Sequence, residues 1–512
     1  MNRLLPDPAA RPATALAAAV LVLALAGCAD MAGIASHATL QDAASLGLTA
    51  DAADPAVAAA PVARTGTQAL DASWWLAFQD PQLDRLIGEA FTANPNLQVA
   101  RARLARAQAS TAIAEAADKP QLNGQLDLTR QKFSGNYVYP APLGGSIQET
   151  GTLQLTGSWE LDFFGKNRAA LDAAIGSAQA AAAEVDAARV LLASNIARSY
   201  FQWARLSEQQ VVARRTLAQR DETLKLVRDR VSAGLDTRLE LRQSEGGLPE
   251  ARQQIEALDE QIALAQHALD ALVGQPGATR SLTPPALATV HGLALQPRIP
   301  IDLLGRRADI AAARWRVEAA TSDVAAARTQ FYPNVNLMAF AGFQSLGFDN
   351  LVKSGSQQWG VGPAVRLPIF EGGRLRANLR GKTADLDAAI ESYNASVLDA
   401  VRDVADQVSS AQSIGRQQVE QRDAQLAAEG AYEIAVQRYR AGLGNYLNVL
   451  TAESAVLAQR RLAVDLAARA LDTQVNLARA LGGGWQPAVA VAVSSAPASA
   501  PPLAGGGVAA AR

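Results

Sequence analysis

The stretch Arg230-Val-Ser-Ala-Gly-Leu-Asp-Thr-Arg-Leu-Glu-Leu-Arg-Gln-Ser-Glu245 occurs a second time, as Arg438-Tyr-Arg-Ala-Gly-Leu-Gly-Asn-Tyr-Leu-Asn-Val-Leu-Thr-Ala-Glu453, at an offset of 208 residues. Further upstream, Asn96–Arg103 corresponds to Asp309–Arg316 at an offset of 213. A repeat of this length is too long for a solenoid, whose units span about 20–50 residues. The pattern therefore indicates a duplicated half-molecule, in which both halves serve equivalent roles.

Each repeated stretch closes a very long helical hairpin. Lys166–Val231 contains no proline, and its apolar residues recur at three- and four-residue spacing, as on one face of a helix. A helix of that range would be ~100 Å long. The second half repeats the pattern over Arg374–Arg440, and both helices turn back at Ala-Gly-Leu, residues 233–235 and 441–443. Helices this long need neighbours along their whole length, as in coiled coils or helical barrels.

Upstream of each long helix, apolar and polar residues alternate as in β-strands. The alternation covers 122–129 and 153–163 in the first half, and 335–343 and 359–369 in the second, with loops at 132–149 and 345–357. In the first pair, the polar positions that we expect to face water are Asn123, Gln125, Asp127, Thr129, Gln154, Thr156, Ser158 and Glu160.

Four strands are too few to close a barrel. Strands of about ten residues can cross a bilayer when tilted, and a membrane sheet must close into a barrel without free edges. A sheet in water would show the same alternation, but isolated two-stranded hairpins are marginal. We therefore expect several chains to pool their strands, and three chains would supply twelve.

Composition excludes several classes of function. The 512 residues are 49% hydrophobic and 5% aromatic, with a net charge of −2. Few aromatic residues favour long helices, and the near-neutral charge gives no basic face for nucleic acid. His37, His267 and His291 are isolated, so no metal site is expected. No nucleophile motif, P-loop or dinucleotide loop is present, so no enzyme activity is expected.

The N-terminus is typical of an exported lipoprotein. Arg3 and Arg11 precede an apolar run over Thr14–Ala26, which is too short to span a membrane. The run ends in Leu25-Ala26-Gly27-Cys28, which resembles the bacterial lipobox, in which the cysteine is lipidated and becomes the mature N-terminus. The alternative is a free or buried cysteine after an ordinary signal. Ala29 follows, where an Asp would imply retention at the inner membrane, so the resemblance implies outer-membrane sorting.

The expected organisation has six parts. They are a signal peptide (1–27), a loose lipidated tether (28–72), a first repeat (73–274), a linker (275–300), a second repeat (301–482) and a flexible tail (483–512). In the first repeat we expect a helix over Pro81–Ala117. Gly246-Gly247-Leu248-Pro249 has no counterpart in the other half, and Pro249 predicts a kink or a broken turn near Glu245.

Four motifs give the chain a family resemblance. They are Trp74-Trp-Leu-Ala-Phe-Gln-Asp-Pro-Gln-Leu83, Ile299-Pro-Ile-Asp-Leu-Leu-Gly-Arg-Arg-Ala-Asp-Ile310, Phe331-Tyr-Pro-Asn-Val335 and the second repeated stretch. Together with the lipobox, they resemble the outer membrane factors, or TolC-type family, and within it the efflux lipoproteins of the NodT-type branch. The second motif usually reads Arg-Arg-Pro-Asp-Ile, and Ala308 replaces the proline here.

The resemblance implies a mainly α fold with a membrane β-barrel portion. In this family the duplicated helix, strand, strand and long hairpin form a homotrimer, with a twelve-stranded barrel in the outer membrane lipid above a helical tunnel. It also implies passive conduction of substrates from a periplasmic adaptor (membrane fusion) protein and an inner-membrane pump of the RND type. The only non-protein group implied is the covalent lipid, palmitate included, on Cys28.

Three other interpretations are open. The same duct could serve type I protein secretion or another export system. A structural coiled-coil lipoprotein would lack the barrel, and a periplasmic adaptor would need a lipoyl-like module, for which the sequence gives no sign.

The resemblance also places functional residues at the two hairpin tips. The residues that it assigns to adaptor contact are Arg230, Gly234, Leu235, Arg438, Tyr439, Gly442, Leu443 and Tyr446. The residues that it assigns to the periplasmic gate are Leu447, Asn448, Leu450 and Thr451. Asn448 and Thr451 stand where the family has a ring of carboxylates, so we expect weak cation selectivity there and closure by Leu447 and Leu450.

Overall fold

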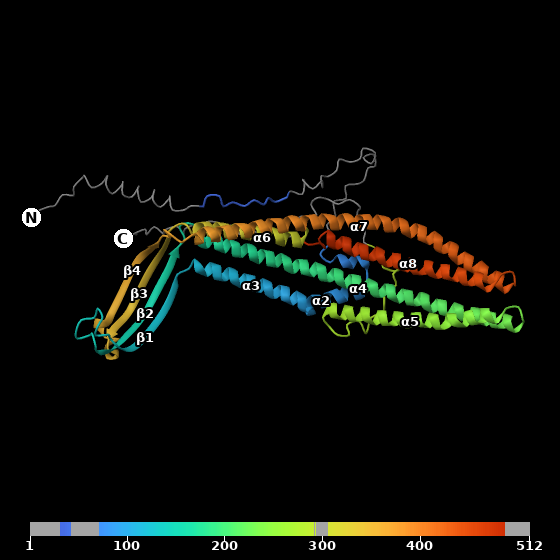
Figure 1. Ribbon diagram of the computed structural model, residues 1–512, viewed down its shortest axis with the longest axis horizontal. Helices are drawn as coiled ribbons and strands as arrows, with labels where there is room; N and C mark the ends of the chain where they lie inside the picture. Colours follow the sequence, from blue (N-terminus) through green and yellow to red (C-terminus); the bar gives the residue numbers. More distant parts are fainter. Residues whose placement is uncertain (1–30, 42–70, 291, 293–305, 487–512) are drawn as a thin grey trace, which may run out of the picture.

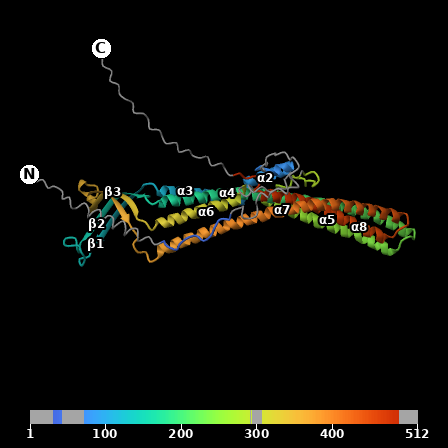
Figure 2. The ribbon, with the colours of Figure 1, turned by 90° about the horizontal axis from the view of Figure 1, so that it is seen from above.

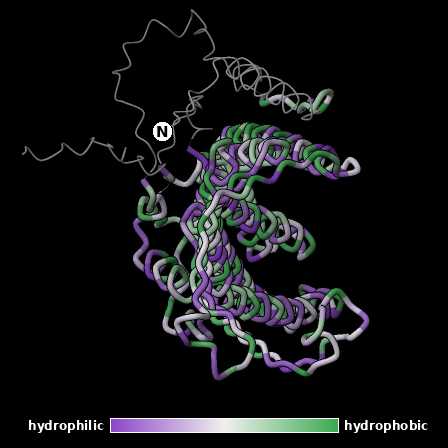
Figure 3. Tube along the Cα trace, turned by 90° about the vertical axis from the view of Figure 1, so that its left-hand side faces the viewer, coloured by the Kyte–Doolittle hydropathy of each residue, from purple (hydrophilic) through white to green (hydrophobic). Residues whose placement is uncertain are grey.

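The chain is an elongated rod with a β-sheet at one end and two helical hairpin tips at the other (Figure 1). This computed structural model describes residues 31–41, 71–290, 292 and 306–486. Seen along the rod, the helices form an open arc and not a closed ring (Figure 3). The helices of one chain therefore enclose only part of a cylinder.

The two halves have the same order of elements, as the sequence predicts. The first half contains the short helix η2 (Trp74–Phe78), α2 (Pro81–Ala93), α3 (Pro95–Ala117), β1 (Gln121–Lys132), β2 (Ile147–Leu161), α4 (Lys166–Ser232) and α5 (Arg238–Val273). The second contains α6 (Ala308–Thr329), β3 (Asn334–Leu346), the short η4 (Phe348–Asn350) and η5 (Ser354–Ser356), β4 (Gln357–Arg366), α7 (Arg374–Arg440) and α8 (Tyr446–Ala480).

The prediction of two very long helices is confirmed. Helices α4 and α7 both have 67 residues, which makes each about 100 Å long. Each begins directly after a left-handed glycine, Gly165 with φ 78° and Gly373 with φ 86°, a conformation that other residues rarely adopt. The strand-to-helix corner is therefore built the same way in both halves.

The single helix expected over Pro81–Ala117 is wrong, because the chain forms α2 and α3 with a break at Asn94. The residue before a proline is pushed toward extended backbone, and Asn94 has φ −64° and ψ 121°. Its side chain then accepts a hydrogen bond from the backbone N–H of Leu97 and caps α3.

The broken turn expected near Glu245 is also wrong, since α5 continues through Pro249. Proline removes one backbone donor and crowds the carbonyls of the preceding turn. The carbonyl that loses its helical donor is that of Glu245, four residues before the proline. Arg220 of α4 contacts the neighbouring part of α5, with its Nη1 2.8 Å from the carbonyl oxygen of Gly247. Because this partner comes from another helix, the sequence around the proline could not reveal it.

The four strands form one antiparallel sheet in the order β1-β2-β3-β4. Its register places Gln125, Gln154 and Gln358 on one face and Leu126 with Leu153 on the other. All eight polar residues predicted to face water share the first face, which confirms the alternation. Within the described chain, β1 and β4 each pair with only one strand, so both outer edges of the sheet are open.

The largest hydrophobic core lies at the waist of the rod, where α2, α4, α5 and α8 meet. The buried rings of Trp74 and Phe78 from η2 enter it, beside Phe201 and Trp203 of α4. Phe78 and Phe201 make an edge-to-face contact with ring centroids 5.1 Å apart. The motif that begins at Trp74 is therefore a packing element.

Two segments expected to be loose are held in place where the structure describes them. Residues 31–41, inside the expected tether, lie along α7 (Figures 1 and 2). At the start of the expected tail, Trp485 donates a hydrogen bond from Nε1 to Asp186 of α4 at 2.9 Å. Within these two segments, residues 28–30, 42–70 and 487–512 lie outside the described residues, Cys28 among them.

Candidate functional site at the hairpin tips

The two tips share one backbone design. At the first, the N–H of Leu235 bonds the carbonyl of Arg230 at 2.9 Å, and at the second Leu443 bonds Arg438 at 2.8 Å. Gly234 (φ 74°) and Gly442 (φ 72°) occupy the left-handed position that ends each helix. This is the Schellman arrangement, which satisfies the last carbonyls of a helix and favours glycine.

The side chains at the tips are not equivalent, because Asp236 stands where the second tip has Gly444. Asp236 accepts hydrogen bonds from Arg230 Nε at 2.9 Å and Nη2 at 3.3 Å. It also accepts a short hydrogen bond from the Tyr439 hydroxyl. Arg230 Nη1 bonds the Tyr439 carbonyl at 3.0 Å, and its guanidinium lies 4.6 Å from the Tyr439 ring centroid. We call Arg230, Asp236 and Tyr439 the tip latch, since it joins α4 and α7.

The tip latch lies beside a small apolar cluster. Tyr439 is fully buried, and Tyr446 is nearly so, with the two ring centroids 6.0 Å apart. Burial and the nearby Asp236 carboxylate raise the pKa of Tyr439, so its hydroxyl stays a donor. Partial burial opposes ionisation of Asp236, but hydrogen bonds from Arg230 and Tyr439 outweigh it and hold the pKa of Asp236 below its usual value.

The residues assigned to adaptor contact fall into two sets. Arg230, Tyr439 and Tyr446 point inward and join the hairpins. The others lie at the surface: Gly234, Leu235, Arg438, Gly442 and Leu443. The assigned contact role stays a prediction for both sets.

Four exposed leucines stand out at the tips. Leu235 and Leu239 are 65% and 63% exposed, and Leu443 and Leu447 are 69% and 59% exposed. The two pairs are related by the repeat offset of 208 residues. Each tip thus presents an equivalent apolar pair to its surroundings.

The assigned gate residues lie on the first turns of α8. Leu447, Asn448 and Thr451 are exposed, whereas Leu450 is half-buried. Asn445 caps this helix by accepting the N–H of Asn448 at 3.0 Å. Their role in closing a channel stays a prediction.

Behind the tips, Arg220 of α4 ties three helices together. Its Nε lies 2.8 Å from Glu453 Oε1 on α8, and its Nη1 lies 2.9 Å from Glu250 Oε2 on α5, besides the bond to the Gly247 carbonyl. The Arg220 and Glu453 side chains are only 16% and 11% exposed.

A second set of contacts meets α4 at Gln219, the residue next to Arg220. Arg460 of α8 makes a bidentate pair with Glu429 of α7, with distances of 2.6 and 2.5 Å. Its Nη1 also donates to Gln219 of α4 at 3.0 Å. The two arginines together connect both hairpins.

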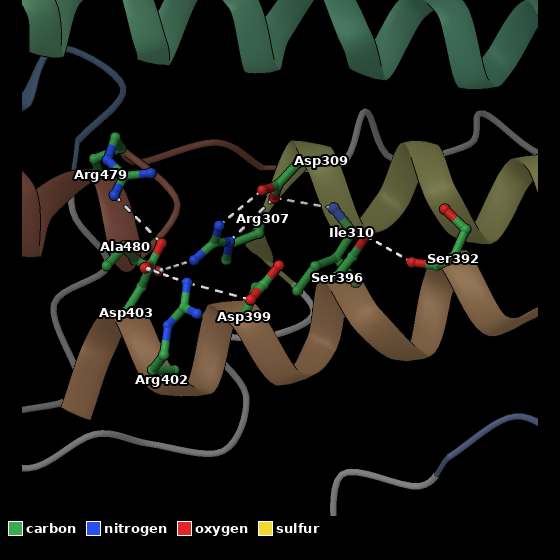
Figure 4. Close-up of polar contacts among 10 residues, drawn as sticks. All are labelled: Arg307, Asp309, Ile310, Ser392, Ser396, Asp399, Arg402, Asp403, Arg479 and Ala480. Carbon is green, nitrogen blue, oxygen red and sulfur yellow. Dashed lines mark hydrogen bonds and ion pairs between the residues drawn. The ribbon is translucent and has the colours of Figure 1, made fainter. Parts of the chain in front are cut away.

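The mid-chain motif has a structural role at the other end of the hairpins. Buried Arg307 makes a bidentate pair with Asp309 and donates to the carbonyl of Ala480 at the end of α8, at 3.1 Å (Figure 4). Nearby, Arg479 and Arg402 both approach Asp403 of α7. The start of α6 is thereby fixed to the end of α8, which Arg479 joins to α7.

Two further observations concern the described residues alone. No described helix is both long and apolar enough to cross a bilayer. In the same part of the chain, no three His, Cys, Asp or Glu side chains gather in a way that could hold a metal ion. Cys28 and His291 lie outside it.

A family model described as outer membrane efflux protein matches residues 86–275 and 299–483. The chain belongs to the outer membrane efflux protein family. It is 33% identical over 480 residues to the multidrug resistance outer membrane protein MdtQ of Escherichia coli, across 92% of this chain and 98% of that protein. It is 38% identical over 385 residues to the fusaric acid resistance protein FusA of Burkholderia cepacia, across 74% of this chain and 71% of that protein.

The fold of this efflux protein matches solved channels. The outer membrane protein VceC of Vibrio cholerae aligns with a TM-score of 0.76 and 38% identity, over 81% of this chain and 100% of that one. The efflux protein is thus an exit duct in the outer membrane that extends into the periplasm. The family resemblance based on the four motifs is confirmed.

Sequence reasoning missed Asp236, Arg220 and Arg460. For Asp236 a signal existed: it is charged at a position where the other copy of the repeat has Gly444. Arg220 and Arg460 give no such signal, because they lie among many other charged residues on long helices and only the packing reveals their partners.

Proposed function

We propose that three copies of this efflux protein form one continuous duct for passive conduction. The observation that carries this proposal is the four-stranded sheet with two open edges joined to helices about 100 Å long. Open edges are not tolerated in lipid, and three such sheets supply twelve strands. The polar face would then line the water-filled lumen, and the apolar face would contact lipid.

At the periplasmic end, the tips receive a periplasmic adaptor that is loaded by an inner-membrane pump of the RND type. The exposed leucine pairs at Leu235 and Leu443 support this, because apolar side chains at a solvent-facing tip suit a protein partner. Two similar proteins are named for multidrug and fusaric acid resistance, which favours small organic compounds as cargo over the proteins of a type I secretion system.

In the resting duct, the tip latch holds the two hairpins together, and Leu447, Asn448, Leu450 and Thr451 narrow the opening. The support is that Arg230 and Asp236, a charged and largely buried pair of the first tip, both bond Tyr439 of α7. Conduction needs no chemical step, so these residues act by position alone. We further propose that Cys28 carries the lipid that its lipobox predicts.

Two measurements test the proposed duct. The purified chain should migrate as a heat-modifiable trimer and should give single-channel conductance in planar bilayers. Leu443→Cys, an exposed position on the second tip, labelled with a short crosslinker in cells, should capture a periplasmic adaptor. A monomer that never conducts contradicts the duct, and capture of a protein-secretion component in place of an efflux adaptor favours the alternative.

A further inference from the structure

Two charged residues on the polar face of the sheet lie at its two open edges. Among the strand residues, this face carries a charge only at Asp127 of β1, Glu160 of β2 and Arg366 of β4. Strands β1 and β4 are the outer strands of the sheet (Figure 1). A carboxylate therefore lies along one open edge and a guanidinium along the other.

The charge at each open edge has no ionic partner in its own chain. Glu160 is paired, with its Oε1 2.9 Å from the Nζ of Lys166. Within the described residues, Asp127 and Arg366 form no ion pair, and both side chains are exposed. Asp127 accepts a hydrogen bond from the Gln125 side chain at 2.6 Å. The unpaired charges thus lie at the edges that a barrel must close.

The sequence repeat carries the register of one hairpin onto the other. The offset of 213 relates Gln121 to Asn334, and the offset of 208 relates Ser158 to Arg366. In the sheet, Gln121 lies opposite Ser158, and Asn334 lies opposite Arg366. Hairpins β1–β2 and β3–β4 are therefore equivalent residue by residue.

The same offsets predict the register between two copies of the chain. Inside one chain β2 pairs with β3, and Ser158 lies opposite Met338. The residues equivalent to these two are Arg366 on β4 and Gln125 on β1. When β4 meets β1 of the next copy as β2 meets β3, Arg366 therefore lies opposite Gln125 of that copy.

This register agrees with the two faces of the sheet. It sets Val365 opposite Leu126 of the next copy, and these side chains are 65% and 58% exposed in the single chain. A shift by one residue would place Val365 opposite a polar residue and would exchange the faces along the whole strand. Apolar side chains on the open edges thus meet each other on the apolar face.

The register also brings the two unpaired charges together. Diagonal neighbours on adjacent strands lie about 7–8 Å apart, within reach of a long side chain. Asp127 is the diagonal neighbour of Arg366, and it is bonded to Gln125, which Arg366 would face directly. The equivalent residues at the β2–β3 boundary are Phe340 and Ser158, which carry no charge. The charges are therefore specific to the boundary between copies.

We propose that Asp127 and Arg366 of neighbouring copies form an ion pair in the lumen and fix the register in which β1 meets β4. This inference rests on the three-copy duct of the proposed function and adds which residues meet at each boundary. Contacts between like edges would bring two carboxylates or two guanidinium groups together, which is destabilising. The charges therefore favour the head-to-tail contact that closes a ring.

The register is tested by disulfide crosslinking of the full chain in outer membranes. Leu126→Cys combined with Val365→Cys should give disulfide-linked dimers and trimers on oxidation, because directly opposite Cβ atoms lie about 4.5–5.5 Å apart, close to the distance in a disulfide. Leu367→Cys or Val361→Cys in place of Val365→Cys reports a register displaced by two or four residues, and the yield should be about tenfold lower. Each single-cysteine variant controls for disulfides with Cys28.

The ion pair is tested by charge reversal. Asp127→Arg or Arg366→Asp alone places like charges at every boundary, so the fraction of heat-modifiable trimer should fall severalfold at low salt. The loss should be smaller at high salt, since charges in a water-filled lumen are screened. The double variant should recover the wild-type fraction, because it restores an opposite pair. A purely structural role of either side chain would leave the double variant as impaired as the single ones.

The outcomes separate this inference from the duct itself. If Leu367→Cys or Val361→Cys crosslinks better than Val365→Cys, the register is overturned. If the single reversals assemble like the wild type, or the double variant does not recover, the ion pair is overturned. In each of these cases, wild-type trimers that conduct still support the duct. A wild type that stays monomeric contradicts both.

Discussion

At the scale of single residues, Asp236 is where the two copies of the repeat differ in a way that creates a contact between them. The two tips share their backbone hydrogen bonds, yet only the first carries a carboxylate, and that carboxylate binds the second tip through Tyr439. The hydrogen bond from Tyr439 to Asp236 therefore joins the two halves of the chain. It depends on a residue that only the first tip has.

Removing Asp236 should loosen the tips. Asp236→Ala leaves the Arg230 guanidinium without its carboxylate, and hydrogen bonds to charged groups contribute about 1.5–3 kcal/mol each. We expect higher single-channel conductance and greater entry of large antibiotics into cells. The matched control is Asp229→Ala, an exposed carboxylate on the last turn of α4. Equal conductance of the two variants would contradict a latch at this position.

The latch should also respond to acid, with a defined sign. The pKa of Asp236 in the folded protein lies below its ordinary value of 3.8. A carboxylate with a lowered pKa contributes stability above its unfolded pKa and loses it as the pH falls through the folded value. Conductance should therefore be unchanged between pH 7 and pH 5 and should rise only below about pH 4. Asp236→Asn should remove this acid response, and a rise already at pH 5 would point to another group.

At the scale of elements, the long helices and strands could be predicted closely, but the joints between them could not. Lys166 and Arg374 begin their helices where the sequence places them, because proline-free apolar periodicity is a local signal. The sequence predicts no break at Asn94, where a helix ends, and predicts a broken turn near Pro249, where the helix continues. Asn94 ends one helix and caps the next, while α5 continues through Pro249 and is held against α4 by Arg220.

Arg220 is more important than an ordinary surface arginine, because it joins α4 to both α5 and α8. Arg220→Ala would leave Glu453 largely buried without a counter-ion and would remove an additional hydrogen bond to the Gly247 carbonyl. Because the pair keeps some exposure, we expect a loss of about 2–3 kcal/mol, below the ~3–5 kcal/mol of a fully buried pair. Hydrogen exchange of α5 should report it as faster opening around Pro249.

The control for that experiment is Arg242→Ala, which removes an exposed ion pair with Glu245 on the same helix. Exposed pairs of this kind contribute at most about 1 kcal/mol. If both substitutions change exchange in α5 equally, the contacts of Arg220 do not hold α5 in place.

At the scale of the whole molecule, the helices form an open arc and the sheet has open edges, so neither forms a closed ring within one chain (Figure 3). The sequence alone predicts this incompleteness, because four strands cannot close. The register adds what the sequence could not, namely which residues of different strands share a face, since pairing joins positions up to about two hundred residues apart.

That register supplies the sharpest test of the barrel. Leu155 and Thr156 are neighbours on β2 that lie on opposite faces of the sheet, opposite Ala341 and Phe340 of β3. If the apolar face contacts lipid, Leu155→Arg places a charge in the bilayer, at a cost of about 2–4 kcal/mol near the midplane, and the heat-modifiable trimer should largely disappear. Thr156→Arg should assemble normally and shift the channel toward anions, because its charge would lie in the lumen. Equal loss of assembly in both variants, or normal assembly of Leu155→Arg, would contradict a lipid-facing surface on this side of the sheet.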